Sequence, residues 1–375
     1  MIHNHITREY DGIVLERIKH LPPGGKMGDL PPHLQHKSFI RTGEKKTGGP
    51  NLRILRLEMD KPSLTVTAYI YNKFVHPVAD RYITPREAAC LQDFPDDWVF
   101  VGKLGEVQHQ IGNAVPVKLA RAIATSVTDF LAERGIYGKI TIASYFCGAG
   151  GLDLGFEQAS SKQHQFQTIF ATDLEPSCGY TIQFNRPNWN FLLGDITSFS
   201  GDIVLKQMGQ KPDVLMGGPP CQPFSVAGRQ KATQDPLGRL YRNYIEHIAQ
   251  LDPKIVIMEN VYGLTQVKRS NMLEEIYKAF QQIGYQVKHQ ELLAADFGTP
   301  QLRRRLIFVA TQGKNTFKFP IPTHTEKQDI FGKPLYRGAG NAFIHLPNPQ
   351  VYKKLTNSLT EMKSISLRSI EAVRC

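Results

Sequence analysis

Short apolar runs alternate with segments of helical spacing through the middle of the chain, from about residue 139 to residue 310. The apolar runs are rich in β-branched residues, which is typical of strands buried in a sheet. They read KITIASYF, QTIFAT, DVLMG, KIVIME and RRLIFVA. Residues 115–133 and 240–251 instead repeat apolar positions at helical spacing. This order predicts an α/β fold in which helices cover a mostly parallel, Rossmann-like sheet.

The two ends of the chain lack this pattern. They are rich in turn formers, as in HLPPGGKMGDLPPH from residue 20 and HLPNPQ from residue 345. Residues 1–60 carry 10 Lys and Arg against 7 Asp and Glu, and residues 326–375 carry 8 against 4. We therefore expect the ends to form a smaller, irregular and basic region.

Composition narrows the function classes. The net charge of +11 favours a polyanionic partner such as nucleic acid. No apolar run approaches the roughly 18 residues of a membrane-spanning helix, and the first residues lack the order of a secretory signal. We expect a protein of the cytoplasm without a membrane partner. Since no C-x-x-C pair or H-E-x-x-H occurs, we expect no metal and reduced thiols at Cys90, Cys147, Cys178, Cys221 and Cys375.

Candidate ligand-binding residues follow the predicted strands, where an open α/β sheet has its ligand crevice. The loop FCGAGGLDLGF, residues 146–156, has glycines that allow a tight turn near a ligand, but Asp153 replaces the last glycine of G-x-G-x-x-G. A tight turn without a ligand is the alternative. Asp173 ends the second strand, where a carboxylate accepts hydrogen bonds from ribose hydroxyls. Asp195 is either an adenine contact or a helix N-cap.

Candidate catalytic residues follow the next strands. Cys221 stands in the proline-stiffened loop GPPCQPF, as a nucleophile or as an inert buried thiol. Glu259, in KIVIMENV, is either an acid that engages a substrate nitrogen or an ion-pair partner. Arg303 and Arg305 point to one face of a strand and Arg304 to the other, so two guanidinium groups face one anion or carbonyl. A solvated basic edge is the alternative.

Taken together, these motifs resemble those of the DNA cytosine-5 methyltransferases. FCGAGGLDLGF is similar to their cofactor loop, GPPCQPFSVAGR to their nucleophile loop, MENV to their glutamate motif and Gln301-x-Arg303-x-Arg305 to their arginine motif. TPREAACLQDFPDDWVF (84–100) and QIGNAVP (110–116) resemble the two motifs that usually close such chains. The resemblance covers most of residues 82–323.

The resemblance implies S-adenosyl-L-methionine as cofactor and a flipped cytosine as substrate. It implies that Cys221 attacks the base, Glu259 engages its ring nitrogen, and Arg305, supported by Arg303, holds the base carbonyl or a phosphate. Leu174 departs from the aromatic residue that often stacks on adenine. The implied cofactor-binding residues are Phe146, Gly148, Gly150, Gly151, Asp173, Leu174, Asp195, Ile196, Pro219 and Asn113.

The order of the motifs differs from the family pattern, because 84–100 and 110–116 precede the cofactor loop. We therefore expect a circularly permuted chain, which proteins tolerate when the old ends lie close together. Residues 1–100 and 326–375 then form the two parts of a target-recognition domain. Residues 101–325 form the catalytic and cofactor-binding domain, with QIGNAVP on a helix within 101–134, a joint at 135–139 and the α/β core at 140–325. Disordered tails at both ends are the competing account.

The family implies duplex DNA as partner, a monomer, and a bacterial restriction-modification system whose endonuclease acts on the same site without direct contact. Two alternatives stay open. Relatives that methylate transfer RNA carry a Cys-Phe-Thr tripeptide, which is absent here. A catalytically silent DNA-binding relative is disfavoured because Cys221, Glu259 and both arginines are present.

Overall fold

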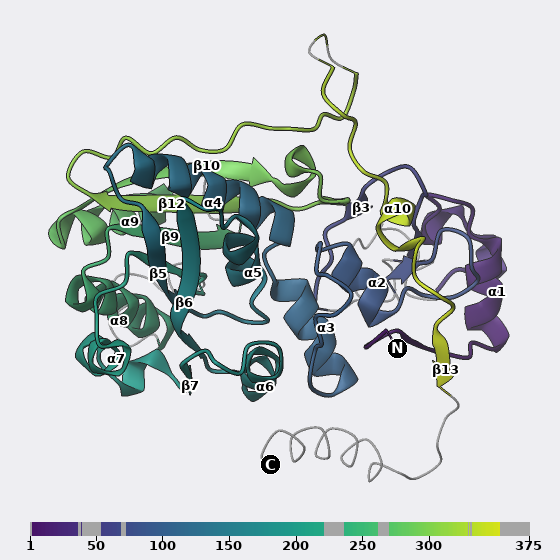
Figure 1. Ribbon diagram of the computed structural model, residues 1–375. Coiled ribbons are helices and arrows are strands. Elements are labelled where there is room, and N and C mark those ends of the chain that lie inside the picture. The colour runs from purple at the N-terminus through teal and green to yellow at the C-terminus, as the bar shows by residue number, and fades with distance from the viewer. Residues whose placement is uncertain are drawn as a thin grey trace. The chain divides into compact units, whose positions relative to one another are not determined.

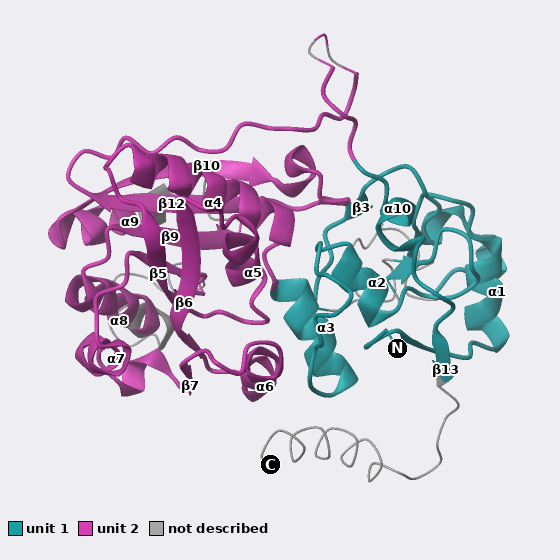
Figure 2. Cartoon of the chain, in the orientation of Figure 1, with its two compact units in different colours: residues 1–113, 337–375 teal, residues 114–336 magenta. Residues whose placement is uncertain are grey.

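The computed structural model divides the chain into two compact units, coloured separately in Figure 2. Unit 1 comprises residues 1–113 and 337–375, and unit 2 comprises residues 114–336. Cys221, the predicted nucleophile, lies outside the described residues. These are residues 2–36, 39, 54–68, 73–220, 236–261, 270–328, 330 and 332–352.

Unit 2 is built on a seven-stranded sheet in the order β10-β12-β9-β8-β5-β6-β7 (Figure 1). Every neighbouring pair from β9 to β7 is parallel, while β12 is antiparallel to both of its neighbours. The sheet therefore confirms the predicted α/β fold. The strands are β5 (Gly138–Tyr145), β6 (His164–Asp173), β7 (Phe191–Leu193), β8 (Val214–Gly217), β9 (Ile255–Val261), β10 (Tyr285–Leu293) and β12 (Arg304–Gln312).

Helices cover both faces of this sheet, α4 and α5 on one and α8 and α9 on the other. Strand β12 shows why the apolar runs are continuous: Ile307 and Val309 join the first hydrophobic cluster, whereas Leu306 and Phe308 join the second. The helices are α4 (Val117–Ala132), α5 (Gly151–Gln158), α6 (Pro176–Asn185), α7 (Gly201–Met208), α8 (Pro236–Leu251) and α9 (Ser270–Gln282).

The predicted strands correspond to β5, β6, β8, β9 and β12, and the two predicted helices to α4 and α8. Strand β10 was not predicted. It pairs only with β12, at the edge of the sheet, and mostly alternates partly buried and exposed positions instead of forming an apolar run. A single covered face thus gives a weaker signal than two covered faces.

Unit 1 has short elements, and its two chain segments are joined through β1 and β13, which pair in parallel. Beside this pair, His5 bridges the segments, with Nδ1 2.9 Å from Thr84 Oγ1 and Nε2 2.7 Å from Pro347 O. The elements are β1 (Ile6–Arg8), α1 (Gly12–His20), η1 (Met27–Asp29), η2 (Pro32–Leu34), β2 (Leu55–Arg56), β3 (Ser63–Leu64), β4 (Phe74–Val75), α2 (Pro85–Cys90), α3 (Leu104–Asn113), α10 (Ala339–Phe343) and β13 (Gln350–Tyr352).

The first segment of unit 1 extends to Asn113, whereas the predicted boundary at residue 100 assigned α3 to the catalytic domain. Hydrogen bonds within unit 1 explain the difference, because Gln92 Nε2 donates to Ile111 O at 2.7 Å and Gln110 Nε2 to Val101 O at 2.9 Å. The functional identity of each domain stays a prediction. In the described part of the chain, every helix is too short or too polar to cross a bilayer.

Candidate functional site

The strand order of unit 2 reverses between β5 and β8. From β5 the chain adds β6 and β7 on one side, then returns to place β8 and β9 on the other. In open α/β sheets the ligand crevice lies beyond the carboxyl ends of the strands at such a point. Phe146 directly follows β5, Asp173 ends β6, Asp195 follows β7 and Pro219 follows β8. The fold therefore brings these four predicted cofactor residues to one edge of the sheet.

The loop after β5 has the backbone conformation that its glycines allow. Phe146, Gly148 and Gly150 all have positive φ, at 51°, 54° and 78°, and Gly150 is the N-cap of α5. The amide N of Gly148 donates to Asp173 Oδ2 at 2.7 Å, so the loop is attached to the end of β6. This geometry presents the N-terminus of α5, which begins at Gly151, as an anion- or dipole-binding end.

Asp173 has a structural function that the sequence did not reveal. Besides the bond from Gly148, its Oδ1 accepts from Glu175 N at 2.9 Å. Burial raises the pKa of the Asp173 carboxyl, and these backbone donors act in the opposite direction. Each carboxylate oxygen has a second lone-pair site, so a ribose contact remains chemically compatible with this arrangement.

Asp195 adopts the N-cap conformation that was its alternative interpretation. Its Oδ1 accepts from Thr197 N at 2.9 Å, at the start of η4 (Ile196–Ser198). Asp195 is exposed, whereas Ile196 is buried. Leu174 is 61% exposed, so the position where relatives often have an aromatic residue presents an aliphatic side chain to solvent. The adenine contacts of these residues stay predictions.

The start of the predicted nucleophile loop is attached to the end of β9. Asn260 Nδ2 donates to Pro219 O at 3.0 Å, two residues before Cys221 in the sequence. A Cβ at Gly218 would lie 2.9 Å from Oε2 of Glu259, so a larger residue at this position would displace that carboxylate. The described residues on the N-terminal side of Cys221 are therefore packed against the glutamate motif.

Glu259 and Arg305 form an ion pair across neighbouring strands. Glu259 faces Ile307 in the antiparallel register, so Arg305, two residues earlier on β12, is its diagonal neighbour on the same face. Their side chains are only 13% and 11% exposed, which makes the charges interact more strongly than a surface pair. Glu259 is thus an ion-pair partner, which was its alternative interpretation. The pair brings the carboxylate of Glu259 next to the guanidinium of Arg305.

The three consecutive arginines alternate as their spacing predicted. Arg303 is 1% exposed, whereas Arg304 faces solvent and pairs with Glu291 at 2.5 Å. Burial, and then the charge of Arg305, lower the pKa of the Arg303 guanidinium, while Glu259 opposes them. Arg303 lies between β11 (Gln301–Leu302) and β12, and its burial excludes the solvated basic edge for this residue. Its support of Arg305 stays a prediction.

Asn113 belongs to unit 1, where it is the last residue of α3. It is exposed, and its Nδ2 lies 3.2 Å from Nε2 of His109. The other predicted site residues belong to unit 2. The cofactor contact of Asn113 therefore stays a prediction.

Sequence reasoning missed Asp153 as a structural residue of the loop. It is fully buried, with Oδ2 3.0 Å from Ser144 Oγ on β5 and Oδ1 3.3 Å from Thr168 Oγ1 on β6. Burial raises the pKa of Asp153 to about 7, against the effect of the Ser144 hydroxyl. This carboxyl fastens the first turn of α5 to two strands. A polar residue at the third glycine position was the available signal.

Comparisons with known proteins agree with this geometry. The family described as C-5 cytosine-specific DNA methylase matches residues 29–129 and 140–369, which include every predicted catalytic and cofactor residue. The chain is 36% identical over 224 residues to Type II methyltransferase M.AquIA of Picosynechococcus sp., covering 55% of this chain and 88% of that protein.

Two further similarities cover less of the matched proteins. Type II methyltransferase M1.HphI of Haemophilus parahaemolyticus is 36% identical over 222 residues, or 58% of this chain and 56% of that protein. The solved structure of a Spodoptera frugiperda DNMT2 mutant is 22% identical with a TM-score of 0.40, covering 52% of this chain and 57% of that one. The chain thus spans about half the length of these two proteins.

The family match extends over well more than half of the chain. It confirms the predicted enzyme class, DNA cytosine-5 methyltransferase, and the predicted cofactor, S-adenosylmethionine. The chain belongs to the C-5 cytosine-specific DNA methylase family.

Proposed function

We propose that this protein methylates carbon 5 of one cytosine within a short site of duplex DNA. The ion pair between Glu259 and Arg305 carries the proposal, together with the attachment of Pro219 to Asn260. They bring an acid, a guanidinium and the start of the Cys221 loop to one edge of the sheet. A target base must leave the duplex to reach such a site, because its ring carbons are inaccessible in the stack.

In this mechanism the thiolate of Cys221 forms a bond to carbon 6 of the flipped cytosine. Glu259 acts as the acid: its protonated carboxyl donates a hydrogen bond to ring nitrogen 3, which draws electron density from the ring and stabilises the adduct. In this proposal Arg305, supported by the buried Arg303, holds the base carbonyl or an adjacent phosphate. Carbon 5, made electron-rich, accepts the methyl group. A base from solvent then takes the proton from carbon 5, the electrons of that C–H bond restore the double bond between carbons 5 and 6, and the bond from carbon 6 to sulfur breaks to release Cys221 as thiolate.

S-adenosylmethionine would supply the methyl group, and we place it beyond the carboxyl ends of β5 to β8. Gly148 and Gly150 leave the backbone open beside the N-terminus of α5, and the exposed Leu174 offers an apolar surface for adenine. We assign the binding of the cofactor to these residues with Phe146, Gly151, Asp173, Asp195, Ile196, Pro219 and Asn113.

We further propose that the chain is circularly permuted and that unit 1 contains the target-recognition region. The parallel pairing of β1 with β13, and the bond from Ala339 N to Lys61 O at 2.8 Å, support a region assembled from both ends of the chain. The family match also breaks between residues 129 and 140, at the predicted joint. In the structure, residues 133–137 form a short connection between the end of α4 and the start of β5.

The biological setting that we propose is a bacterial restriction-modification system. Two relatives carry the name Type II methyltransferase, and the net charge of +11 suits a DNA partner. In this setting the protein acts as a cytoplasmic monomer and protects DNA from an endonuclease that recognises the same site.

The test is transfer of a labelled methyl group to duplex DNA, with sequencing of the modified positions and a transfer-RNA control. We expect label at cytosine in one short DNA site, and none after Cys221→Ala, which should keep cofactor affinity. Label only in RNA would replace the proposal with the transfer-RNA activity. Cofactor binding without label anywhere would identify a silent relative, and turnover by Cys221→Ala would overturn the mechanism.

A further inference from the structure

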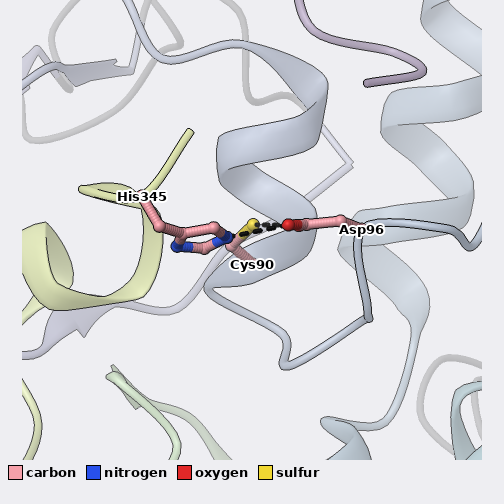
Figure 3. A group of neighbouring side chains, drawn as sticks. All are labelled: Cys90, Asp96 and His345. Carbon is pink, nitrogen blue, oxygen red and sulfur yellow. Dashed lines mark hydrogen bonds and ion pairs between the residues drawn. The ribbon is translucent and has the colours of Figure 1, made fainter. Parts of the chain in front are cut away.

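Three side chains that commonly bind metal ions meet in unit 1 (Figure 3). Cys90 is the last residue of α2, Asp96 lies in the loop that follows, and His345 comes just after α10. Cys90 Sγ lies 3.7 Å from Asp96 Oδ1, and His345 Nε2 lies 2.8 Å from Asp96 Oδ2. All three potential ligand atoms lie within 4.8 Å of one another.

The spacing is close to that of a tetrahedral zinc site. Zinc binds sulfur at about 2.3 Å and imidazole nitrogen or carboxylate oxygen at about 2.0–2.2 Å, so neighbouring ligand atoms lie about 3.3–3.6 Å apart. The separations from Asp96, 3.7 Å at Oδ1 and 2.8 Å at Oδ2, lie on either side of that range, and no two of the ligand atoms are more than 4.8 Å apart. Binding one ion therefore requires the side chains to shift by about an ångström. A thiolate, a carboxylate and a neutral imidazole also balance the charge of one divalent ion.

The surrounding structure holds two of the ligands in place. The buried guanidinium of Arg86 donates to Pro95 O at 2.9 Å and to Trp98 O, on both sides of Asp96. Arg86 also lies one helical turn before Cys90 on α2. These contacts fix the helix end and the loop together, as a metal site needs.

The cluster is open to solvent on the side of its third ligand, His345. The side chain of His345 is 53% exposed and that of Asp96 is 33% exposed, whereas Cys90 is buried. An ion can therefore enter from the His345 side and keep a water molecule in its fourth position.

We propose that Cys90, Asp96 and His345 bind one Zn²⁺ ion, which ties the segment after α10 to α2. In binding, the Sγ–H bond of Cys90 breaks, the proton passes to solvent and the sulfur bonds to zinc. The role is structural and methyl transfer itself needs no metal, but such a site would overturn the expectation, drawn from the cysteine spacing, that the chain binds no metal. The cysteine-spacing rule could not find this site, because His345 and Asp96 are 249 residues apart in the chain.

The experiment titrates the metal-stripped full-length protein with Co²⁺ and then displaces the cobalt with Zn²⁺. We expect one ion per chain and a thiolate-to-cobalt charge-transfer band. His345→Gln, at an exposed position, should weaken Co²⁺ and Zn²⁺ binding at least tenfold, and Cys90→Ala should abolish the band. As matched controls, Cys178→Ala and Cys221→Ala should keep both the band and the affinity.

The proposal is overturned if the wild-type protein gives no charge-transfer band. It is also overturned if Cys90→Ala keeps the band, if Cys221→Ala removes it, or if His345→Gln binds Zn²⁺ as tightly as the wild type. In those cases the three groups form a hydrogen-bonded cluster without an ion. Should Cys90→Ala fail to fold, His345→Gln and the isosteric Asp96→Asn decide between the two outcomes by their Zn²⁺ affinity alone.

Discussion

Units 1 and 2 satisfy their backbone hydrogen bonds in different ways. In unit 2 a seven-stranded ladder pairs the buried backbone, and apolar clusters cover both faces of the sheet. The strands of unit 1 are only two or three residues long in the described part of the chain, so most of its backbone cannot pair in ladders. Buried polar groups of a backbone are costly unless they find partners.

In unit 1, buried arginines supply many of these partners. Arg56 Nη2 donates to Ile18 O at 2.6 Å, and its Nε donates to Leu21 O at 2.7 Å. Its Nη1 reaches His76 O at 3.0 Å. Arg86 binds the carbonyls of three separate residues, among them His3 O at 3.0 Å through Nε. A single guanidinium has five N–H donors, so it can hydrogen-bond the carbonyls of several loops at once. It thereby pairs backbone groups that a strand would pair within a sheet.

The difference teaches that stability is concentrated in unit 1 and distributed in unit 2. Loss of one ladder residue leaves most of a sheet intact, whereas loss of one arginine leaves several buried carbonyls without donors. The chain has two tryptophans, Trp98 in unit 1 and Trp189 in unit 2, so single-tryptophan variants let each unit be observed separately.

The largest expected effect separates function from stability in unit 2. Glu259→Gln should lower kcat for methyl transfer by about 10²–10⁴, because the acid that engages ring nitrogen 3 is lost. Unfolding followed through Trp189 should still be cooperative. Glu291→Gln removes a more exposed ion pair, with Arg304, and should change kcat less than about twofold. Equal losses in both variants would contradict the assignment of Glu259.

Next in size is the loss of a buried arginine in unit 1. Arg86→Met should lower the free energy of unfolding by about 3–5 kcal/mol, because three buried carbonyls lose their donor. Urea unfolding followed through Trp98 measures it. Arg304→Met, at an exposed position of β12, should change stability by no more than about 0.5 kcal/mol. An equally small change for Arg86→Met would refute the claim that the stability of unit 1 depends on a few buried arginines.

The two units should also respond to pH in opposite directions. Burial lowers the pKa of His76 in unit 1 to about 4, although Glu87 opposes this. Because the folded pKa of His76 lies below its unfolded value, the free energy of unfolding of unit 1 should fall by up to about 3 kcal/mol as the pH falls from about 6.5 through 4. In unit 2, burial raises the folded pKa of Asp153 to about 7, above its unfolded value. The free energy of unfolding of unit 2 should therefore fall by up to about 4 kcal/mol as the pH rises from about 4 through 7.

Urea titrations at several pH values, followed through Trp98 and Trp189, test this contrast. His76→Gln should flatten the acid loss of unit 1, and Asp153→Asn should flatten the loss of unit 2 towards neutral pH. Parallel pH profiles for the two units, or unchanged profiles in these variants, would show that other groups govern the pH dependence.

A glycine in each unit gives a smaller contrast. A Cβ at Gly155 on α5 would lie 2.3 Å from Ala120 Cβ on α4, so Gly155→Ala should destabilise unit 2 by about 1–3 kcal/mol. Gly105 on α3 has open space around its Cα, and Gly105→Ala should stabilise unit 1 by up to about 1 kcal/mol. Thermal unfolding measures both changes. If both variants were stabilised, the packing of α4 against α5 would have adapted to the added methyl group.

The smallest expected effect concerns cofactor affinity. Leu174→Trp should tighten S-adenosylmethionine binding by about 1 kcal/mol, or about fivefold, because an indole stacks on adenine where leucine offers only an aliphatic contact. Calorimetric titration measures the dissociation constant. Ile203→Trp, at an exposed position on α7, should leave it unchanged. No gain at Leu174 would place adenine elsewhere.

Much of unit 2 was predictable because its pattern is local. Strands β8 and β9 are buried on both faces and therefore appear as continuous apolar runs, and the residues after them are the ligand-binding positions of the fold. Edge strand β10 escaped prediction because one covered face leaves mixed positions. In unit 1 the strand-like stretch from Arg53 to Phe74 forms only two-residue strands among its described residues.

By itself, the sequence determined most of the sheet and the family, and it supplied the candidate site residues, because periodicity and short motifs are properties of neighbours in the chain. Only the tertiary structure decided that Glu259 pairs with Arg305, that Asp153 fastens α5 to β5 and β6, and that β1 pairs with β13. Those contacts join residues far apart in sequence, and their energies depend on burial and on the donors that folding brings together.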